Sequence, residues 1–151
     1  IGEAKAVTIL AACELGKRRQ ASDIEKRLNL NSAISIYNYM YPKVQDKDIE
    51  EAWILLLNQK LDLIEAKCIS HGGITGTAID IRIILKEALL RNATAIALCH
   101  NHPSGNPRPS REDDNITNSL KKAADTMHIY FVDHVIVAQQ HFYSYREEGR
   151  I

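Results

Sequence analysis

Two histidines separated by one residue, His100-Asn101-His102, form the part of the sequence with the clearest chemical potential. They directly follow an apolar run, residues 93–99, which predicts a buried strand. Side chains two residues apart on an extended segment point to the same side, so both imidazoles can reach one metal ion. Asn101 then points to the opposite side. A His-x-His pair alone is a short motif, and it gains weight only if a further ligand follows.

A carboxylate follows at a suitable place. Residues 110–127 predict a helix in which Asp113 heads the apolar stripe of Ile116 and Leu120. A charge on an inward face needs a partner, and a cation held by two histidines would supply one. Two histidines and one carboxylate leave a fourth zinc position open for water, as in catalytic sites. The alternative is a capping box with Ser110 as N-cap and Asp113 at N3, and the two interpretations are compatible.

A third histidine, His134, lies between Val132 and Ile136 in a predicted strand. We interpret it as a core histidine with satisfied hydrogen bonds. The alternative is that it supports a metal ligand from behind.

The remaining patterns predict the elements that would hold this group in place. Strands are expected at 51–57, 61–70, 93–99, 129–138 and 141–146, and helices at 3–19, 81–89 and 110–127. A further helix is expected from Asn31-Ser32 to the residue before Pro42, because the residue before proline avoids helical geometry. The alternation of helices and strands predicts an α/β (α+β) class with a mixed central sheet flanked by helices.

Composition limits the classes of function. The chain has 151 residues, of which 45% are hydrophobic and 25% charged, and this balance suits one globular domain with a short appendage. Lys+Arg and Asp+Glu both number 19, so a net charge of zero argues against strong DNA binding by this chain alone. Three cysteines without paired spacing fit a reducing compartment, and we expect a cytoplasmic protein. No apolar run approaches the ~20 residues of a membrane span, so no membrane partner is expected.

The segment from His100 to Asp113 resembles the signature of the RadC family, a branch of the JAMM/MPN metalloproteases that carries a DNA-repair name. Within it lies the wider JAMM pattern of His-x-His, seven residues, Ser110, two residues and Asp113. The resemblance extends over residues 50–151. It implies a JAMM/MPN (cytidine-deaminase-like) fold with one zinc ion per chain, held by His100, His102, Asp113 and a water.

The same resemblance implies two catalytic roles. Glu51, which opens the first strand, would be the general base, and Ser110 would stabilise the tetrahedral intermediate. Glu50 stays open as the alternative base. Glu51 is preferred for its match to the family pattern and because it shares a strand face with Trp53, Leu55 and Leu57. A carboxylate beside zinc can accept the proton of a water whose pKa the metal has lowered to about 7.

The first residues resemble the second half of the helix-hairpin-helix unit that precedes the RadC domain. We therefore divide the chain into an N-terminal helical segment, residues 1–42, and a RadC-like metal-binding domain, residues 43–151. The chain begins at Ile1 without an initiator methionine, and we interpret it as part of a longer protein. In that protein the full N-terminal region could contact DNA phosphates. The sequence predicts no oligomeric state.

Two segments depart from the family pattern, which usually has a Ser-Gly-Thr loop and a Pro-Arg-Glu helix entry. Here they read His71-Gly72-Gly73 and Ile81-Arg82-Ile83, so substrate preference transfers less well than metal binding. We expect a zinc hydrolase that cleaves an amide or isopeptide bond in a peptide or protein. The alternative is a metal-stabilised, non-catalytic interaction module in DNA repair or recombination. A base deaminase is disfavoured, because the Pro-Cys-x-x-Cys ligand pair is missing.

Overall fold

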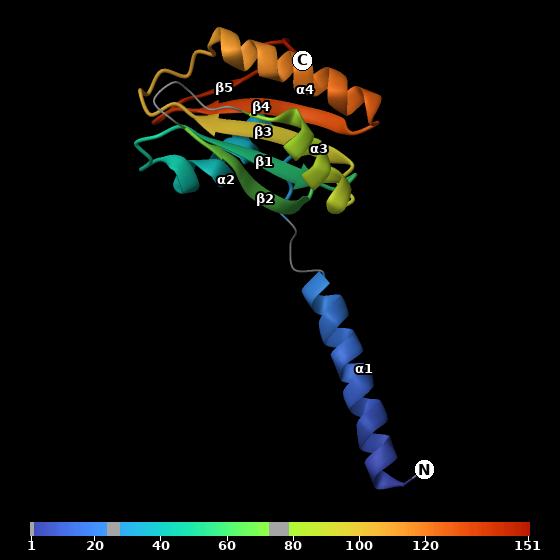
Figure 1. Ribbon diagram of the computed structural model, residues 1–151. Coiled ribbons are helices and arrows are strands. Elements are labelled where there is room, and N and C mark those ends of the chain that lie inside the picture. Colours follow the sequence, from blue (N-terminus) through green and yellow to red (C-terminus); the bar gives the residue numbers. More distant parts are fainter. Residues whose placement is uncertain (1, 24–27, 73–78) are drawn as a thin grey trace.

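The computed structural model describes residues 2–23, 28–72 and 79–151. In chain order these residues form α1 (Glu3–Asp23), α2 (Ala33–Val44), β1 (Glu51–Leu57), β2 (Leu63–His71), α3 (Ile81–Leu90), β3 (Ala95–Asn101), α4 (Arg111–Thr126), β4 (Tyr130–Val137) and β5 (Phe142–Ser144). The predicted α/β class with a mixed sheet is confirmed (Figure 1).

The five strands form one sheet in the order β2-β1-β3-β4-β5. β3 and β4 are parallel, and the other three neighbouring pairs are antiparallel. Every residue of β3 is buried, as expected for a central strand that is covered on both faces. α4 connects the two parallel strands, so the C-terminal end of β3 and the start of α4 lie at the same end of the sheet (Figure 1).

Helices cover both faces of the sheet (Figure 1). α2 packs on one face, against alternate residues of β1 and β3 such as Leu55 and Cys99. α3 and α4 pack on the other face, where the intervening residues such as Ile54 and Leu98 lie. The period of two therefore divides the buried apolar side chains of β1 and β3 between two cores.

α2 ends later than predicted. The helix was expected to stop before Pro42, but it continues through that proline to Val44. The side chain of Val44 is 2% exposed and completes the buried stripe of Ala33, Ile36 and Met40. Burying a valine contributes about 1.5–3 kcal/mol, which is comparable with the roughly 3 kcal/mol that a proline costs inside a helix through its missing N–H and its steric clash. α2 thus spans the predicted boundary at residues 42–43 and packs into the core of the sheet.

α1 begins at Glu3 as predicted and continues to Asp23, beyond the predicted end at Arg19. The side chains of residues 2–16 are exposed, including the apolar Val7 and Leu10. Among the described residues, no helix is both long enough and apolar enough to cross a membrane.

The strands near the candidate ligands shift slightly from their predicted bounds. β3 begins two residues later than expected and continues through His100 and Asn101. β5 has three residues rather than six, because the chain turns after Ser144, whose carbonyl accepts from the Glu148 N–H at 3.2 Å. The antiparallel pairing of β4 with β5 confirms the predicted closing hairpin.

Candidate metal centre

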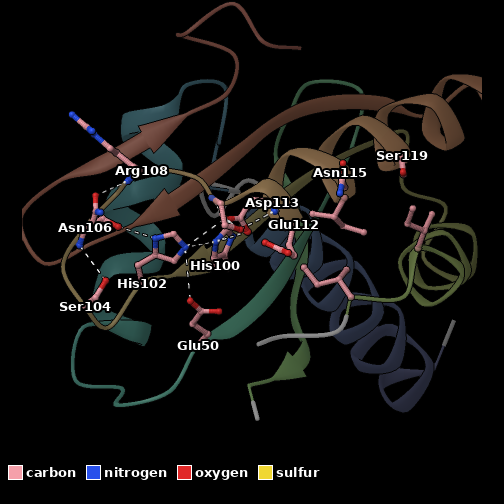
Figure 2. Close-up of a pocket in the computed structure, with 14 residues that line it drawn as sticks. Glu50, His100, His102, Ser104, Asn106, Arg108, Glu112, Asp113, Asn115 and Ser119 are labelled. Carbon is pink, nitrogen blue, oxygen red and sulfur yellow. Dashed lines mark hydrogen bonds and ion pairs between the residues drawn. The ribbon is translucent and has the colours of Figure 1, made fainter. Parts of the chain in front are cut away.

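Both histidines of the His-x-His pair lie at the end of β3 and face α4 (Figure 2). His100 is the penultimate residue of the strand and is 3% exposed. His102 follows the strand, and its N–H donates to the Val137 carbonyl at 2.9 Å, which continues the parallel pairing with β4. This extended backbone brings the two Nε2 atoms to 3.0 Å from each other, as the spacing of two predicted.

Asp113 lies in the first turn of α4 and has two functions at once. Its N–H donates to Ser110 Oγ at 3.1 Å, and its Oδ2 accepts from the N–H of Ser110 at 2.7 Å, which completes the capping box. Its Oδ1 lies 3.2 Å from His100 Nε2, and its Oδ2 lies 3.6 Å from His102 Nε2. The structure therefore shows the capping box and, at the same residue, a carboxylate that faces both imidazoles.

The charges of the group are those of a cation-binding site. Burial raises the pKa of Asp113, but its contacts with the edges of the two imidazoles outweigh burial and hold that pKa well below the usual range. For His102, burial lowers the pKa, while Asp113 and the Asn106 carbonyl raise it by more. The carboxylate is thus ionised, and it attracts positive charge to the imidazole edge.

The residues present fit a metal ion. One ligand atom each from His100, His102 and Asp113 lies within 4.8 Å of the others. His102 Nδ1 lies 2.7 Å from the Asn106 carbonyl, which can only accept, so in the neutral ring Nε2 carries a lone pair. That lone pair faces His100 Nε2 at 3.0 Å, a distance that either a shared proton or a bound metal ion can bridge. Two imidazole nitrogens and one carboxylate oxygen form a ligand set that suits a divalent transition-metal ion.

The ligand group forms part of the wall of a cavity of about 830 Å³ (Figure 2). Ile79, Ile81 and Ile116 give the cavity an apolar wall. Its polar lining consists of Glu50, His100, His102, Ser104, Asn106, Arg108, Ser110, Glu112, Asp113, Asn115 and Ser119. A substrate held in this cavity could reach the fourth side of a bound metal.

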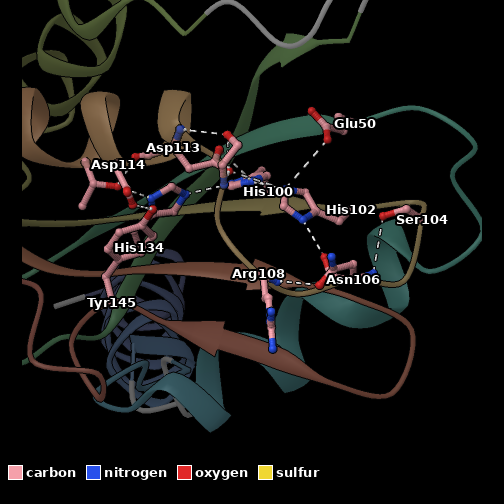
Figure 3. A network of polar contacts seen from close by, with 12 residues as sticks. Glu50, His100, His102, Ser104, Asn106, Arg108, Asp113, Asp114, His134 and Tyr145 are labelled. Atoms are coloured by element: carbon pink, nitrogen blue, oxygen red, sulfur yellow. Dashed lines mark hydrogen bonds and ion pairs between the residues drawn. The ribbon is translucent and has the colours of Figure 1, made fainter.

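The structure brings Glu50, rather than Glu51, to this group. Glu50 lines the cavity, and its Oε1 lies 3.8 Å from His102 Nε2 (Figure 3). Glu51 is 3% exposed and lies on the α2 side of β1, where it contacts Lys47 at 3.2 Å and His71 at 3.4 Å. The preference for Glu51 rested on its match to the family pattern and on the face it shares with Trp53. That shared face directs Glu51 away from the candidate ligands.

Asn101, between the two histidines, holds the backbone that carries Glu50. Its Oδ1 accepts from the Glu51 N–H at 2.7 Å, and its Nδ2 donates to the Ile49 carbonyl at 3.0 Å. The amide thus bonds the residues on both sides of Glu50. As predicted, Asn101 points away from the imidazoles, but sequence reasoning gave it no function. A signal was present, since Asn101 is a polar residue on a strand face otherwise occupied by Ala95, Ala97 and Cys99.

His134 lies in β4, is fully buried and contacts the site directly. Its Nε2 lies 2.8 Å from His100 Nδ1. His134 is therefore a core histidine with satisfied hydrogen bonds, as interpreted from the sequence. It also contacts the candidate ligand His100, as the alternative interpretation required. Burial lowers the pKa of His134 well below the ordinary histidine value, so its ring is neutral.

Comparison with known proteins agrees with the site. The family model described as "RadC-like JAB domain" matches residues 30–150. UPF0758 proteins from Flavobacterium johnsoniae, Symbiobacterium thermophilum and Thermotoga maritima are 42%, 38% and 36% identical to this chain over 149, 149 and 154 residues. These matches cover 99%, 99% and 100% of this chain. They cover 65%, 63% and 68% of the relatives, so the chain spans about two thirds of their length. The resemblance found in the signature is confirmed, and the chain belongs to the RadC-like JAB domain family.

Proposed function

We propose that this chain is a zinc-dependent hydrolase that cleaves an amide or isopeptide bond in a peptide or protein. The observation that carries the proposal is the convergence of His100, His102 and Asp113 in the wall of a cavity that also contains Glu50. Catalytic zinc sites have three protein ligands and keep a fourth position open. When bound, zinc would polarise the scissile carbonyl and lower the pKa of a water molecule to about 7.

Glu50 is the proposed general base in place of Glu51. Its carboxylate accepts the proton of the attacking water and then passes it to the leaving nitrogen. The distance of 3.8 Å from His102 Nε2 leaves Glu50 beside the ligands without making it one of them. Glu51 is unsuited to this role because Lys47 and the Trp53 indole N–H, at 3.2 and 3.1 Å, already occupy its two oxygens.

Ser110 is the proposed donor to the oxygen of the tetrahedral intermediate. It lines the cavity as the N-cap of α4, and its hydroxyl donates to Asp113 Oδ2 at 2.8 Å. To bind a substrate oxygen the hydroxyl must rotate from that carboxylate towards the cavity. A donor aimed at developing negative charge typically contributes about 2.7–4 kcal/mol to transition-state stabilisation.

The size and lining of the cavity support a peptide segment as the substrate. A volume of about 830 Å³ lies in the range of small-ligand pockets, roughly 300–1,000 Å³. The isoleucine wall can accept an apolar side chain, while the polar lining can bind backbone groups. A net charge of zero gives little counterion release, so DNA binding by this chain should be weak at physiological salt.

The test is to load the protein with zinc and incubate it with a diverse peptide library that includes isopeptide-linked members. Products are identified by mass spectrometry, with His102→Ala as the control that removes a ligand. We expect cleavage that depends on both zinc and His102. In parallel, labelled DNA is incubated with the same samples. Tight DNA binding at ~150 mM salt, with no cleavage of any peptide, would favour the non-catalytic DNA-repair module instead.

A further inference from the structure

Behind the candidate ligands, a buried series of hydrogen bonds connects His100 to the backbone of α4. We propose that Thr117 and His134 are positioning residues that fix the tautomer of His100, so that its Nε2 is always available to a metal ion. This inference rests on the proposed metal site. It is independent of hydrolysis and of the identity of the substrate.

Three short contacts form the series, and Figure 3 shows the first of them, between His100 and His134. His100 Nδ1 lies 2.8 Å from His134 Nε2, and His134 Nδ1 lies 2.6 Å from Thr117 Oγ1. Thr117 Oγ1 in turn lies 2.6 Å from the carbonyl oxygen of Asp113, one turn earlier in α4. All three side chains are at most 3% exposed, so the contacts are protected from competing water.

The number of available protons fixes the direction of every bond. The three contacts, which are N···N, N···O and O···O pairs at 2.6–2.8 Å, each need one proton between the two atoms. The Asp113 carbonyl can only accept, so the single hydroxyl proton of Thr117 is directed to it. Thr117 Oγ1 must then accept from His134 Nδ1–H, and neutral His134 accepts at Nε2 from His100 Nδ1–H. With its Nδ1 protonated, neutral His100 carries its lone pair at Nε2.

Tyr145 holds the middle ring of the series in the required plane. Its ring stacks on His134 with centroids 4.9 Å apart and planes inclined by 3° (Figure 3). The Tyr145 hydroxyl donates to Asp114 Oδ1 at 2.8 Å, and Arg150 contacts the same oxygen at 2.7 Å. Rotation of the His134 ring would break its two hydrogen bonds and this stack together.

The two candidate ligands reach the same tautomer by different routes. His102 donates its Nδ1 proton directly to the Asn106 carbonyl at 2.7 Å, on the loop after β3. His100 reaches a carbonyl only through His134 and Thr117. Metal-ligating histidines commonly have their other nitrogen fixed in this way, and loss of the partner typically costs about 10–100-fold in metal affinity.

The first test reads the tautomer directly in the parent protein. Two-dimensional ¹H–¹⁵N spectra of the imidazole rings are recorded at slightly alkaline pH, for the metal-free and the zinc-loaded protein. We expect His100 and His134 each to carry the proton at Nδ1 in both samples. A neutral His100 protonated at Nε2 in the metal-free protein would overturn the proposal without any reference to catalysis.

The second test removes the Thr117 hydroxyl, which sets the direction of the hydrogen bonds in the series. In Thr117→Val, His134 loses its acceptor at Nδ1 and can donate through Nε2 to His100, whose own proton then moves to Nε2. We expect a mixture of His100 tautomers and about tenfold weaker zinc binding. Thr117→Ser, which restores the hydroxyl, should recover both properties.

Thr126→Val is the matched control. Thr126 Oγ1 donates to the Lys122 carbonyl at 2.9 Å, so it makes the same type of bond on the same helix, away from the site. We expect no change in the His100 spectrum or in zinc affinity for this variant. Equal effects in the two valine variants, or an unchanged His100 tautomer in a folded Thr117→Val protein, would refute the positioning role.

Discussion

Glu50 and Glu51 are neighbours in the chain, but they lie in opposite environments. Glu50 faces the cavity and the His102 imidazole, whereas Glu51 lies on the opposite face of β1, beside Lys47, Trp53 and His71. Strand geometry accounts for the difference, because successive residues point to opposite faces of a sheet. The comparison teaches that a carboxylate becomes available for chemistry at this site through the face it occupies. Residue type and position near the start of β1 do not distinguish the two, because both are glutamates at that place.

The two faces of β1 also differ in the clusters of potential metal ligands that lie near each glutamate. Glu51, Cys68 and His71 also bring ligand atoms within 4.8 Å of one another. On that side, however, the Lys47 ammonium already neutralises Glu51, and burial raises the pKa of the Cys68 thiol, so the thiol is protonated. On the other side Asp113 is ionised and faces two imidazoles. We therefore expect the two groups to respond very differently to zinc.

The largest expected effect separates these two groups. His100→Ala removes a ligand and should weaken zinc binding by more than the roughly 100-fold typical of losing a supporting residue. Cys68→Ser, on the opposite side of β1, should leave affinity and a stoichiometry of about one zinc per chain unchanged. Competition with a metal indicator measures both. If Cys68→Ser lost as much zinc as His100→Ala, the wrong cluster would have been assigned as the centre.

The next effect separates the two glutamates directly. Glu50→Gln should keep zinc bound but lower the rate of peptide cleavage by ~10²–10⁴-fold, because an amide cannot accept the proton of the attacking water. Glu51→Gln should retain activity. Steady-state cleavage rates and zinc content are measured for both variants. The reverse pattern, with activity lost only in Glu51→Gln, would restore Glu51 as the base.

A smaller effect is expected at Asn101, which connects the two sides. Asn101→Ala leaves the Glu51 N–H and the Ile49 carbonyl without their partner, which should cost about 1–3 kcal/mol of unfolding free energy. Because these groups flank Glu50, we also expect kcat to fall while zinc affinity is retained. Denaturant unfolding, zinc titration and kinetics separate the three properties. A loss of stability without any change in kcat would limit Asn101 to a structural role.

The smallest effect concerns the pH dependence of stability. Burial raises the pKa of Glu51, but the Trp53 and Lys47 hydrogen bonds outweigh it, and the net pKa lies below the ordinary value of 4.5. The stabilisation is therefore present above pH 4.5 and is lost as pH falls through the lowered pKa. Glu51→Gln should therefore lower the free energy of unfolding by about 1.5 kcal/mol at neutral pH and by little in acid. Denaturant unfolding of the parent and of Glu51→Gln at pH values from neutral to acid measures this difference in unfolding free energy. A difference that stays constant at all pH values would contradict the prediction.

Local patterns in the sequence predicted much of the molecule. The apolar strand before His100, the spacing of two between the histidines and the helix that begins at Ser110 depend on neighbouring residues, so the candidate ligands could be named in advance. The mixed sheet followed from the alternation of element types. The position of Glu50 could not be decided in this way. A shift of one residue reverses the face of a strand, and only the pairing of Ala52 with His100 fixes which glutamate enters the cavity.

The sequence by itself determined the types and spacing of His100, His102 and Asp113, because a strand and a helix turn place these side chains through local geometry alone. The tertiary structure decided what lies around them. Thr117 and His134 are 17 residues apart, and His134 is 34 residues from His100, yet they form one series of hydrogen bonds. No local pattern encodes that contact. It arises because β3 and β4 are parallel neighbours and α4 packs across them, and this arrangement is stabilised by apolar burial distributed over the whole domain.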